Sequence, residues 1–442
     1  MRTKKVHELG DWQRFGGAKW QGWLPGLLLL CSTEACTASR VGTPSVGVGR
    51  PSAQAAAMHS PSGKPAELYR SRTPAPPPTD PFARNLKGEL DRQMKRLGHA
   101  ALVEDGRLDQ VASDLSRMTA EKSVPTSSVL TFLLRYYGVV EPEPNLIEIR
   151  GERGAEPSAI EDLGRQVGAM STASTWRQVG IGIWRLGDAW SATIALQEDS
   201  LVVAPLPRAL PSGGHAVISG RVDSAYRSPE VLVTPPTGAV ARLPLQLYGP
   251  AFTARLECNL GDGVYQVEVT AEDRRGPTVL ANFPVYCGVA LPLSVQVAAA
   301  GAANVTDPRS VETQILDLMD RDRASNGLPP LQRDSRLAKV AEAYSREMAE
   351  GGEIAHLSPR TGNAVDRIRA AQISPMPTTV AENVGRDYSA EAIERALMAS
   401  PGHRDNILSR AVTHVGVGVA LGKREGNAIP IFVTQVFAGW GL

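Results

Sequence analysis

Apolar residues recur at helical spacing in the last third of the chain, where two long helices are predicted. The first would begin after Ser310 and end at Gly327, because serine caps helix starts and glycine ends helices. The second would begin at Asp334 and end at Gly351 and Gly352. The apolar faces consist of Val311, Ile315 and Leu318 in the first helix and of Leu337, Val340, Ala341, Tyr344 and Met348 in the second.

Two shorter helices and two strands complete this pattern. Val365 and Ile368 indicate a short third helix, and Ser389 would cap a fourth helix that carries Ile393 and Leu397. Alternating apolar positions then predict two strands, one at Val415, Val417 and Val419 and one at Ile431, Val433 and Gln435. Helices that precede paired strands are typical of an α+β layered domain.

Parts of this pattern occur a second time near the start of the chain. The segment DGRLDQVASDLSR (105–117) matches DSRLAKVAEAYSR (334–346), and QVGIGI (178–183) matches HVGVGV (414–419) in the same order. Chance similarity of two amphipathic helices explains one match but not both in order. We therefore expect an internal duplication, with a second α+β domain over residues 82–200.

Between the two copies the periodicity changes to that of short strands. Glycine and proline turns separate them, which indicates a β-sandwich over residues 201–300. The turn DGVY that ends at Tyr265 resembles the corner turn of immunoglobulin-like domains, although Val267 stands where their second cysteine is usual. Cys258 and Cys287 either pair with each other, as an exported protein favours, or remain two buried thiols.

The N-terminus predicts export. Basic residues and the apolar run WLPGLLLLC form a signal-like segment over residues 1–36. The run is far shorter than the roughly 20 apolar residues that span a bilayer, and no other segment is a candidate transmembrane span. Cys31 is a candidate lipid anchor, with cleavage and secretion as the alternative. Residues 37–81 are rich in Pro, Ser and Ala, which predicts a disordered, extended spacer. It precedes the three expected domains, of which the last covers residues 304–442.

The balanced charge of the chain argues against a nucleic-acid partner. The chain has 47 basic and 46 acidic residues and a net charge of +1. Proteins that bind nucleic acid carry a basic surface, so we expect no nucleic-acid partner. An exported location, secreted or on the cell surface, instead implies a component of the envelope, a lipid or another protein as ligand.

A set of motifs over residues 304–442 resembles the CAP superfamily of cysteine-rich secretory, antigen 5 and pathogenesis-related proteins, in its cysteine-poor bacterial form. They occur in that family's order and cover the whole domain. The resemblance implies an α-β-α sandwich with an open cleft. The motifs are GLPPLQRDSRL, AEAYSREMAE, HLSPR, AENVG, ASPGHRDNIL, HVGVGVA and TQVFA.

By this resemblance His356, Glu382 and His403 line the cleft. The family's second glutamate follows a tryptophan, but here Leu397 replaces the tryptophan and Ser400 stands near the glutamate's place. Two imidazoles and a carboxylate suit Zn²⁺ with open positions, so His356 and His403 are candidate metal ligands. The alternative is a cleft without metal, in which His403 and Glu382 bond each other.

Three further polar residues belong to the candidate cleft. Asn383 is expected to bond backbone beside it, and Gln435 either faces it or is a satisfied core amide. Ser400, three residues before His403, invites a Ser-His nucleophile, but no acidic partner is evident nearby, and a serine in an S-P-G turn is usually a cap.

The first copy lacks this chemistry. By offset from the matching helices, Ser127 stands where His356 would be. The segment EPNLIEIRG would pair Asn145 with Asn383 and place Pro144 at the glutamate. We expect this degenerate copy to act as a scaffold or as a surface for the second copy; the alternative is that it binds a different ligand.

Three functions follow from these residues. In the first, the cleft of His356, Glu382 and His403 binds an extracellular or envelope component without catalysis, which we prefer. In the second, the two histidines hold zinc and Glu382 is the general base of a hydrolase. In the third, the chain is a structural spacer of the envelope or matrix, and the cleft is dispensable.

Overall fold

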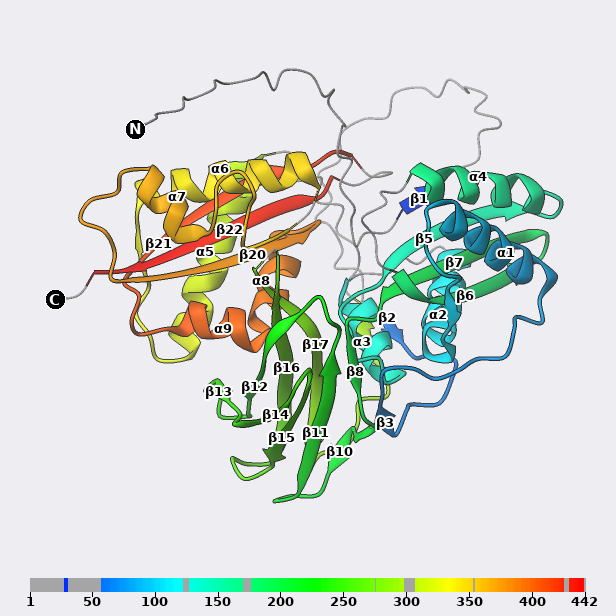
Figure 1. Cartoon of the computed structure of the whole chain (residues 1–442), viewed down its shortest axis with the longest axis horizontal. Coiled ribbons are helices and arrows are strands. Elements are labelled where there is room, and N and C mark those ends of the chain that lie inside the picture. The colour runs from blue at the N-terminus through cyan, green and yellow to red at the C-terminus, as the bar shows by residue number, and fades with distance from the viewer. Residues whose placement is uncertain are drawn as a thin grey trace, which may run out of the picture.

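The structure of the chain is a computed structural model that describes residues 28–30, 57–121, 127–169, 176–274, 276–297, 307–352, 354–424 and 429–440. Within these residues the chain forms two mixed α/β domains, which flank an all-β domain (Figure 1). Cys31 and most of the predicted export segment lie outside the described residues.

The C-terminal domain has three layers around one sheet. Its strands lie in the order β19-β21-β22-β20, with β19 parallel to β21 and the other neighbours antiparallel. Helix α6 covers one face of the sheet, and α5 and α8 cover the other. The elements are α5 (Pro308–Ser325), β19 (Gln332–Arg333), α6 (Ser335–Gly351), α7 (Ala364–Ala370), β20 (Thr379–Asp387), α8 (Ala390–Met398), α9 (Pro401–Leu408), β21 (His414–Leu421) and β22 (Ile431–Gly439).

The glycines of the HVGVGV motif explain how α6 lies on the sheet. A Cβ at Gly416 would stand 2.1 Å from the Ala338 nitrogen, and one at Gly418 would stand 2.0 Å from the Glu342 nitrogen. Because no side chain fits there, the helix backbone rests directly on β21. The valines of this motif are therefore buried in the core, and its glycines let the backbone of α6 approach β21.

The four predicted helices are present, and one predicted boundary is wrong. Helix α5 is capped by Asp307, whose carboxylate accepts the Arg309 and Ser310 amides, and not by Ser310. Pro308 favours the first helical position and so moves the start upstream. The predicted pattern also omitted β20 and α9, which hold Glu382 and His403.

The first domain repeats the strand order of the C-terminal sheet. Its order is β1-β5-β7-β6-β4, so that β4, β6, β7 and β5 correspond to β19, β21, β22 and β20. In the same way, Ser116 Oγ lies 3.0 Å from the Thr193 hydroxyl, as Ser345 Oγ lies 2.8 Å from that of Thr434. The elements are β1 (Leu28–Leu30), α1 (Pro81–Arg96), β4 (Val103–Glu104), α2 (Gly106–Ala120), α3 (Ser127–Tyr136), β5 (Asn145–Glu152), α4 (Glu156–Ala169), β6 (Trp176–Leu186) and β7 (Ala189–Glu198).

The strand register gives an alignment of the two α/β domains that differs from the one expected from the sequence. Counted from the two bonded threonines, Ile147 and Leu146 of β5 stand at the places of Asn383 and Glu382 in β20. The pairing of Asn145 with Asn383 is therefore wrong by two residues. A shift of two keeps every side chain on its face of the sheet, so the polarity pattern alone does not detect it.

The central domain consists of two packed sheets, which are antiparallel except that the edge strand β10 is parallel to β17. They have the strand orders β10-β17-β16-β12-β13 and β14-β15-β11-β8. A disulfide joins Cys258 to Cys287. The Tyr265 hydroxyl donates to the Gly261 carbonyl (3.0 Å) and accepts from the Leu260 amide (2.8 Å), which closes the corner. The strands are β8 (Leu201–Val203), β9 (Leu206–Pro207), β10 (Ala209–Leu210), β11 (His215–Val222), β12 (Arg227–Thr234), β13 (Ala241–Arg242), β14 (Leu245–Tyr248), β15 (Ala251–Glu257), β16 (Gly263–Asp273) and β17 (Gly276–Cys287).

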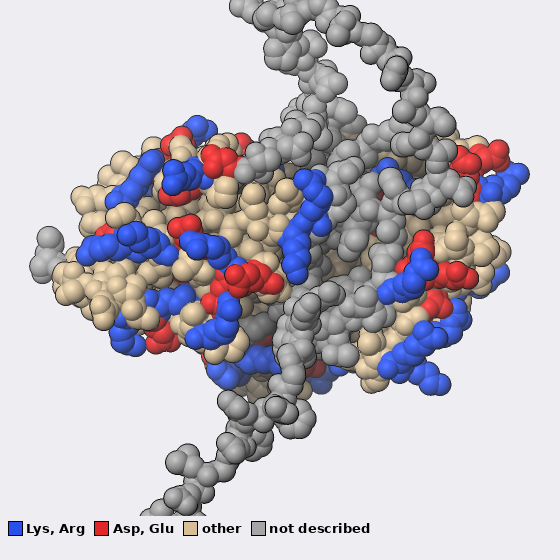
Figure 2. Space-filling model, turned by 90° about the horizontal axis from the view of Figure 1, so that it is seen from above, with Lys and Arg blue, Asp and Glu red and all other residues tan. Residues whose placement is uncertain are grey.

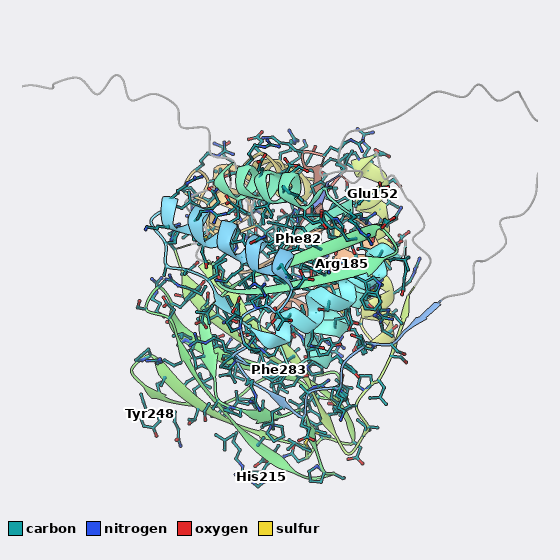
Figure 3. All side chains as sticks on the ribbon, turned by 90° about the vertical axis from the view of Figure 1, so that its right-hand side faces the viewer. Phe82, Glu152, Arg185, His215, Tyr248 and Phe283 are labelled. Carbon is teal, nitrogen blue, oxygen red and sulfur yellow. A yellow bond between two sulfur atoms is a disulfide. The ribbon has the colours of Figure 1, made fainter. Side chains whose placement is uncertain are left out.

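Part of the predicted spacer is packed against these domains. Strand β2 (Ala57–His59) pairs with β18 (Val295–Val297), and β3 (Leu68–Tyr69) pairs with β9. Tyr69 is fully buried, its ring centroid lies 4.8 Å from that of Phe283, and its hydroxyl donates to the Pro284 carbonyl. Phe283 lies near the junction of the sandwich with the first domain, far from Tyr248 and His215 at the other end (Figure 3). The expectation of a disordered spacer over 37–81 is thus wrong for residues 57–81, because a buried aromatic anchors the extended segment.

The described surface agrees with the balanced charge. On the face shown in Figure 2, basic and acidic side chains are interspersed over both α/β domains. No helix of the described part of the chain is long and apolar enough to cross a membrane.

Candidate functional site

The structure brings His356, Glu382 and His403 together. His356 lies in the loop between α6 and α7, Glu382 lies in β20, and His403 lies in α9. The two imidazole centroids are 6.0 Å apart, with an angle of 31° between the rings. Both histidine residues are partly exposed, the His356 side chain to 22%, whereas Glu382 is buried. We call these two side chains the histidine pair.

Glu382 bonds His356 and not His403. The Glu382 Oε1 atom lies 3.1 Å from His356 Nδ1, and its Oε2 atom accepts from Arg367 Nη2 at 2.5 Å. The Arg367 guanidinium lies over the Tyr344 ring, with its Cζ atom 3.4 Å from the centroid. Both carboxylate oxygens are therefore engaged by protein side chains. Sequence reasoning missed Arg367, since nothing in the helical pattern of α7 marks it as the partner of Glu382.

Asn383 and Gln435 belong to a buried amide network. Asn383 Nδ2 donates to the His403 carbonyl (3.1 Å) and to Gln435 Oε1 (2.9 Å), and its Oδ1 atom accepts from Asn406 (2.9 Å). Gln435 Nε2 in turn donates to Glu394 Oε2 at 2.8 Å. Since Asn383 and Gln435 are both 0% exposed, they hold α9 on the sheet and do not face a ligand. Burial raises the pKa of Glu394 to about 8.

Ser400 does have an acidic partner, which comes from another domain. Its hydroxyl donates to Glu268 Oε2 at 2.5 Å, and the Gly402 amide donates to Glu268 Oε1 at 3.0 Å. The sequence expectation of no nearby acid is therefore wrong, because Glu268 is remote in sequence and reaches Ser400 from β16. The order Glu-Ser-His differs from that of a catalytic triad, in which the acid orients the histidine. Ser400 is also buried, so it does not fit the role of nucleophile.

Burial shifts the pKa values of two residues near Ser400, Glu268 and His403. Burial raises the pKa of Glu268, while the hydrogen bonds from Ser400 and Gly402 oppose that change. Burial, with a smaller effect of His356, lowers the pKa of His403 to about 3. His403 is accordingly a neutral imidazole at neutral pH. Its Nδ1 atom lies 2.8 Å from Ser400 Oγ.

The residues present do not fit a zinc site with three protein ligands. Glu382, the third candidate ligand, is engaged by His356 and Arg367, so the histidine pair alone would have to supply the ligands. No group of three or more His, Cys, Asp or Glu side chains in the described part of the chain is arranged to hold a metal ion. Two imidazole nitrogens alone give fewer ligands than structural or catalytic zinc sites use.

Relatives of this domain are known. The family model of the cysteine-rich secretory protein family, CAP, matches residues 316–437. The uncharacterized protein YkwD of Bacillus subtilis is 37% identical over 108 residues, which are 24% of this chain and 41% of YkwD. The uncharacterized membrane protein YlbC of the same organism is 34% identical over 109 residues, 24% of this chain and 31% of YlbC. The chain thus covers less than half of each relative's length.

Solved structures give more distant matches. An extracellular protein with an SCP domain from Bacillus anthracis is 17% identical, with 52% of this chain and 82% of that chain covered and a TM-score of 0.27. A cysteine-rich secretory protein from Staphylococcus aureus is 13% identical, with 63% and 89% covered and a TM-score of 0.25. The match of the family model to residues 316–437, together with the Bacillus relatives, shows that the C-terminal domain is a CAP domain of the bacterial type.

Proposed function

We propose that the chain is an exported protein whose CAP domain binds a component of the cell envelope through the histidine pair. The observation that carries this proposal is the division of the polar cluster. His356 and His403 are partly exposed, while Glu382, Asn383, Ser400 and Gln435 are buried and bonded to one another or to neighbours. A ligand therefore meets two positioned imidazoles on a rigid support.

This division favours recognition over turnover. A hydrolase needs an activated nucleophile or a base free to take a proton. Glu382 is bonded by Arg367 and His356, and Ser400 donates its hydroxyl proton to Glu268. Both groups are thus engaged in holding protein side chains, which supports recognition.

Two observations support export. The chain begins with a basic segment and an apolar run of signal-like form. Cys258 and Cys287 form a disulfide, a bond typical of proteins that fold outside the cytoplasm. Lipid attachment at Cys31 stays a prediction, which mass spectrometry of the protein from a bacterial host would test.

Two further assignments complete the proposal. The domain over residues 82–200 is a degenerate CAP-like copy, supported by its strand order and by the shared serine-threonine bond. Leu146 and Ile147 replace Glu382 and Asn383 there, so it lacks the polar cluster. The domain over residues 201–300 is an immunoglobulin-like sandwich, supported by its two sheets and the Tyr265 corner.

The first prediction tests the site directly. The chain, with its disulfide intact, is incubated separately with soluble peptidoglycan fragments and with vesicles of anionic phospholipid. We expect one of the two probes to bind to the wild type. The His356→Ala/His403→Ala variant should bind this probe at least about tenfold more weakly, because each lost hydrogen bond between uncharged groups is worth about 1 kcal/mol. Calorimetry measures the fragments and co-sedimentation measures the vesicles.

The control variant is His414→Ala. His414 lies in the same domain, where it bonds Thr413 and contacts the Trp440 ring, outside the histidine pair. Equal affinity of the wild type and the double variant for both probes would refute the binding site and favour the spacer hypothesis. Release of cleaved peptidoglycan by the wild type, absent in the double variant, would instead establish the hydrolase alternative.

A further inference from the structure

Glu268 performs in the CAP domain a task that this domain does not perform for itself. It lies within β16 of the sandwich, is 0% exposed, and faces the start of α9. Ser400 occupies the N-cap position of α9 but makes no side-chain cap bond to that helix. The carboxylate of Glu268 accepts the Gly402 amide instead, so a residue of another domain caps α9.

The bonds of Glu268 determine where the protons lie. A carboxylate at a helix N-terminus accepts hydrogen bonds, here from the Gly402 amide and from the Ser400 hydroxyl. Because a hydroxyl has one proton, Ser400 has none left for His403. The contact of 2.8 Å between Ser400 Oγ and His403 Nδ1 therefore requires that Nδ1 carry the proton and donate it. A neutral imidazole protonated at Nδ1 has an unprotonated Nε2.

His356 also donates a hydrogen bond from its Nδ1 atom. Its Nδ1 atom faces Glu382 Oε1, and Glu382 accepts a bond from Arg367 on its other oxygen. A carboxylate paired with arginine is an acceptor, so His356 donates from Nδ1. An imidazole that donates from Nδ1 and carries a single proton has Nε2 as an acceptor, so the single-proton form of the histidine pair offers two acceptor nitrogens on rings whose centroids are 6.0 Å apart.

We propose that Glu268 is a positioning residue for the neighbouring CAP domain, which fixes His403 as its Nδ1-protonated tautomer and so selects a ligand that donates hydrogen bonds. Two acceptors suit the hydroxyl and amide N–H groups of a glycan, and they do not suit a phosphate or carboxylate, which also accept. The ligand class rests on the function proposed above; the tautomer does not.

The tautomer is measured in the chain labelled with ¹⁵N only in histidine. Long-range ¹H–¹⁵N spectra distinguish a protonated Nδ1 from a protonated Nε2, and the His403→Ala variant assigns the signal. We expect His403 to be protonated at Nδ1 in the wild type at neutral pH. In Glu268→Gln the side-chain amide donates to Ser400, the serine proton turns toward His403, and the protonated nitrogen becomes Nε2.

A matched variant and a binding assay separate the possible outcomes. Glu272→Gln changes an exposed carboxylate of the same strand, which pairs with Arg227, and should leave His403 unchanged. A wild-type His403 protonated at Nε2, or one whose tautomer is the same in Glu268→Gln, would overturn the positioning role. If Glu268→Gln does not fold, Ser400→Ala removes the middle of the chain of bonds and should abolish the preference for Nδ1.

The ligand class has its own readout. Glu268→Gln should weaken the binding of peptidoglycan fragments by about tenfold, with Glu272→Gln equal to the wild type. Preferential binding of anionic vesicles would overturn the ligand class and leave the tautomer result intact. Loss of the tautomer effect with binding unchanged would overturn the positioning role and leave the function proposed for the histidine pair intact.

Discussion

At the scale of single residues, the CAP domain holds its two partly exposed histidines with buried side chains. Arg367 and Glu382 fix His356, while Glu268 and Ser400 fix His403. Each imidazole is thereby oriented by a carboxylate, directly in one case and through a hydroxyl in the other. Such support reduces the entropy that a binding site loses when its ligand arrives.

A prediction at this scale concerns Glu394. Its pKa is raised by burial to about 8 from 4.5, so between those values the folded state binds more protons than the unfolded state. The free energy of unfolding therefore falls as pH rises through this window, by at most about 1.4 kcal/mol per pH unit from this group. Glu394→Gln should remove that part of the slope. The free energy of unfolding of the variant should therefore rise relative to that of the wild type between pH 5 and pH 8.5.

Urea unfolding of both proteins at the two pH values checks this expectation. Glu347→Gln is the control, because the pKa of Glu347, unlike that of Glu394, is lowered by its hydrogen bonds and titrates outside the window. An equal change of stability with pH in the wild type and in Glu394→Gln would contradict the prediction.

At the scale of elements, backbone contact between α6 and β21 fixes the platform of the site. The Gly418→Ala change would force a Cβ to within 2.0 Å of the Glu342 nitrogen. Overpacking of this kind costs about 1–3 kcal/mol, and more where backbone cannot move. We expect Gly418→Ala to lower the free energy of unfolding by about 3 kcal/mol, whereas Gly351→Ala, with no atom within 4 Å of its added Cβ, should stay within about 0.5 kcal/mol. Chemical unfolding of both variants provides the comparison.

The same scale shows how far the sequence predicts the fold. Apolar periodicity and capping residues are local, so the helices from Asp334 and Ser389 and the strand at Val415 follow from the sequence. The convergence of His356 and His403 follows from the family's motifs. Strand register and the burial of Tyr69 depend on contacts between distant segments, which neither periodicity nor composition contains.

The candidate site is predictable to a similar extent. The motifs identify the residues that converge, but not which of them contact a ligand. Glu268, 132 positions before Ser400, could not be found because no pattern links β16 to α9. Arg367 could not be assigned to Glu382 either, since a surface arginine in an amphipathic helix looks the same in sequence as a buried one.

At the scale of the whole molecule, the sandwich contributes the carboxylate of Glu268 to the CAP domain, and the first domain also contacts the CAP domain, where the Ser127 hydroxyl donates to Asp387 Oδ2 at 2.6 Å. The disulfide between Cys258 and Cys287 links the end of β15 to the end of β17, in opposite sheets. Closing a loop of 29 residues in the unfolded chain stabilises by about 3 kcal/mol. Cys258→Ser/Cys287→Ser should therefore lower the unfolding free energy of the sandwich by about that amount.

Differential scanning calorimetry of the oxidised protein and the double serine variant measures this loss. An unchanged transition of the sandwich would show that the disulfide adds no stability. Because Glu268 lies in β16, which pairs with β17 along its length, we also expect the His403 tautomer to become mixed at the temperature where the variant's sandwich unfolds.

The position of Glu268 has a consequence for how this protein can be divided. A CAP domain cut out at residue 304 retains both histidines, Glu382 and the sheet beneath them, but leaves the start of α9 uncapped and Ser400 open to water. We expect this domain to keep its fold, while His403 returns to the mixture of tautomers that a free histidine has. On the proposed role of Glu268, recombination that gives this CAP domain a new neighbouring domain would also change its ligand preference.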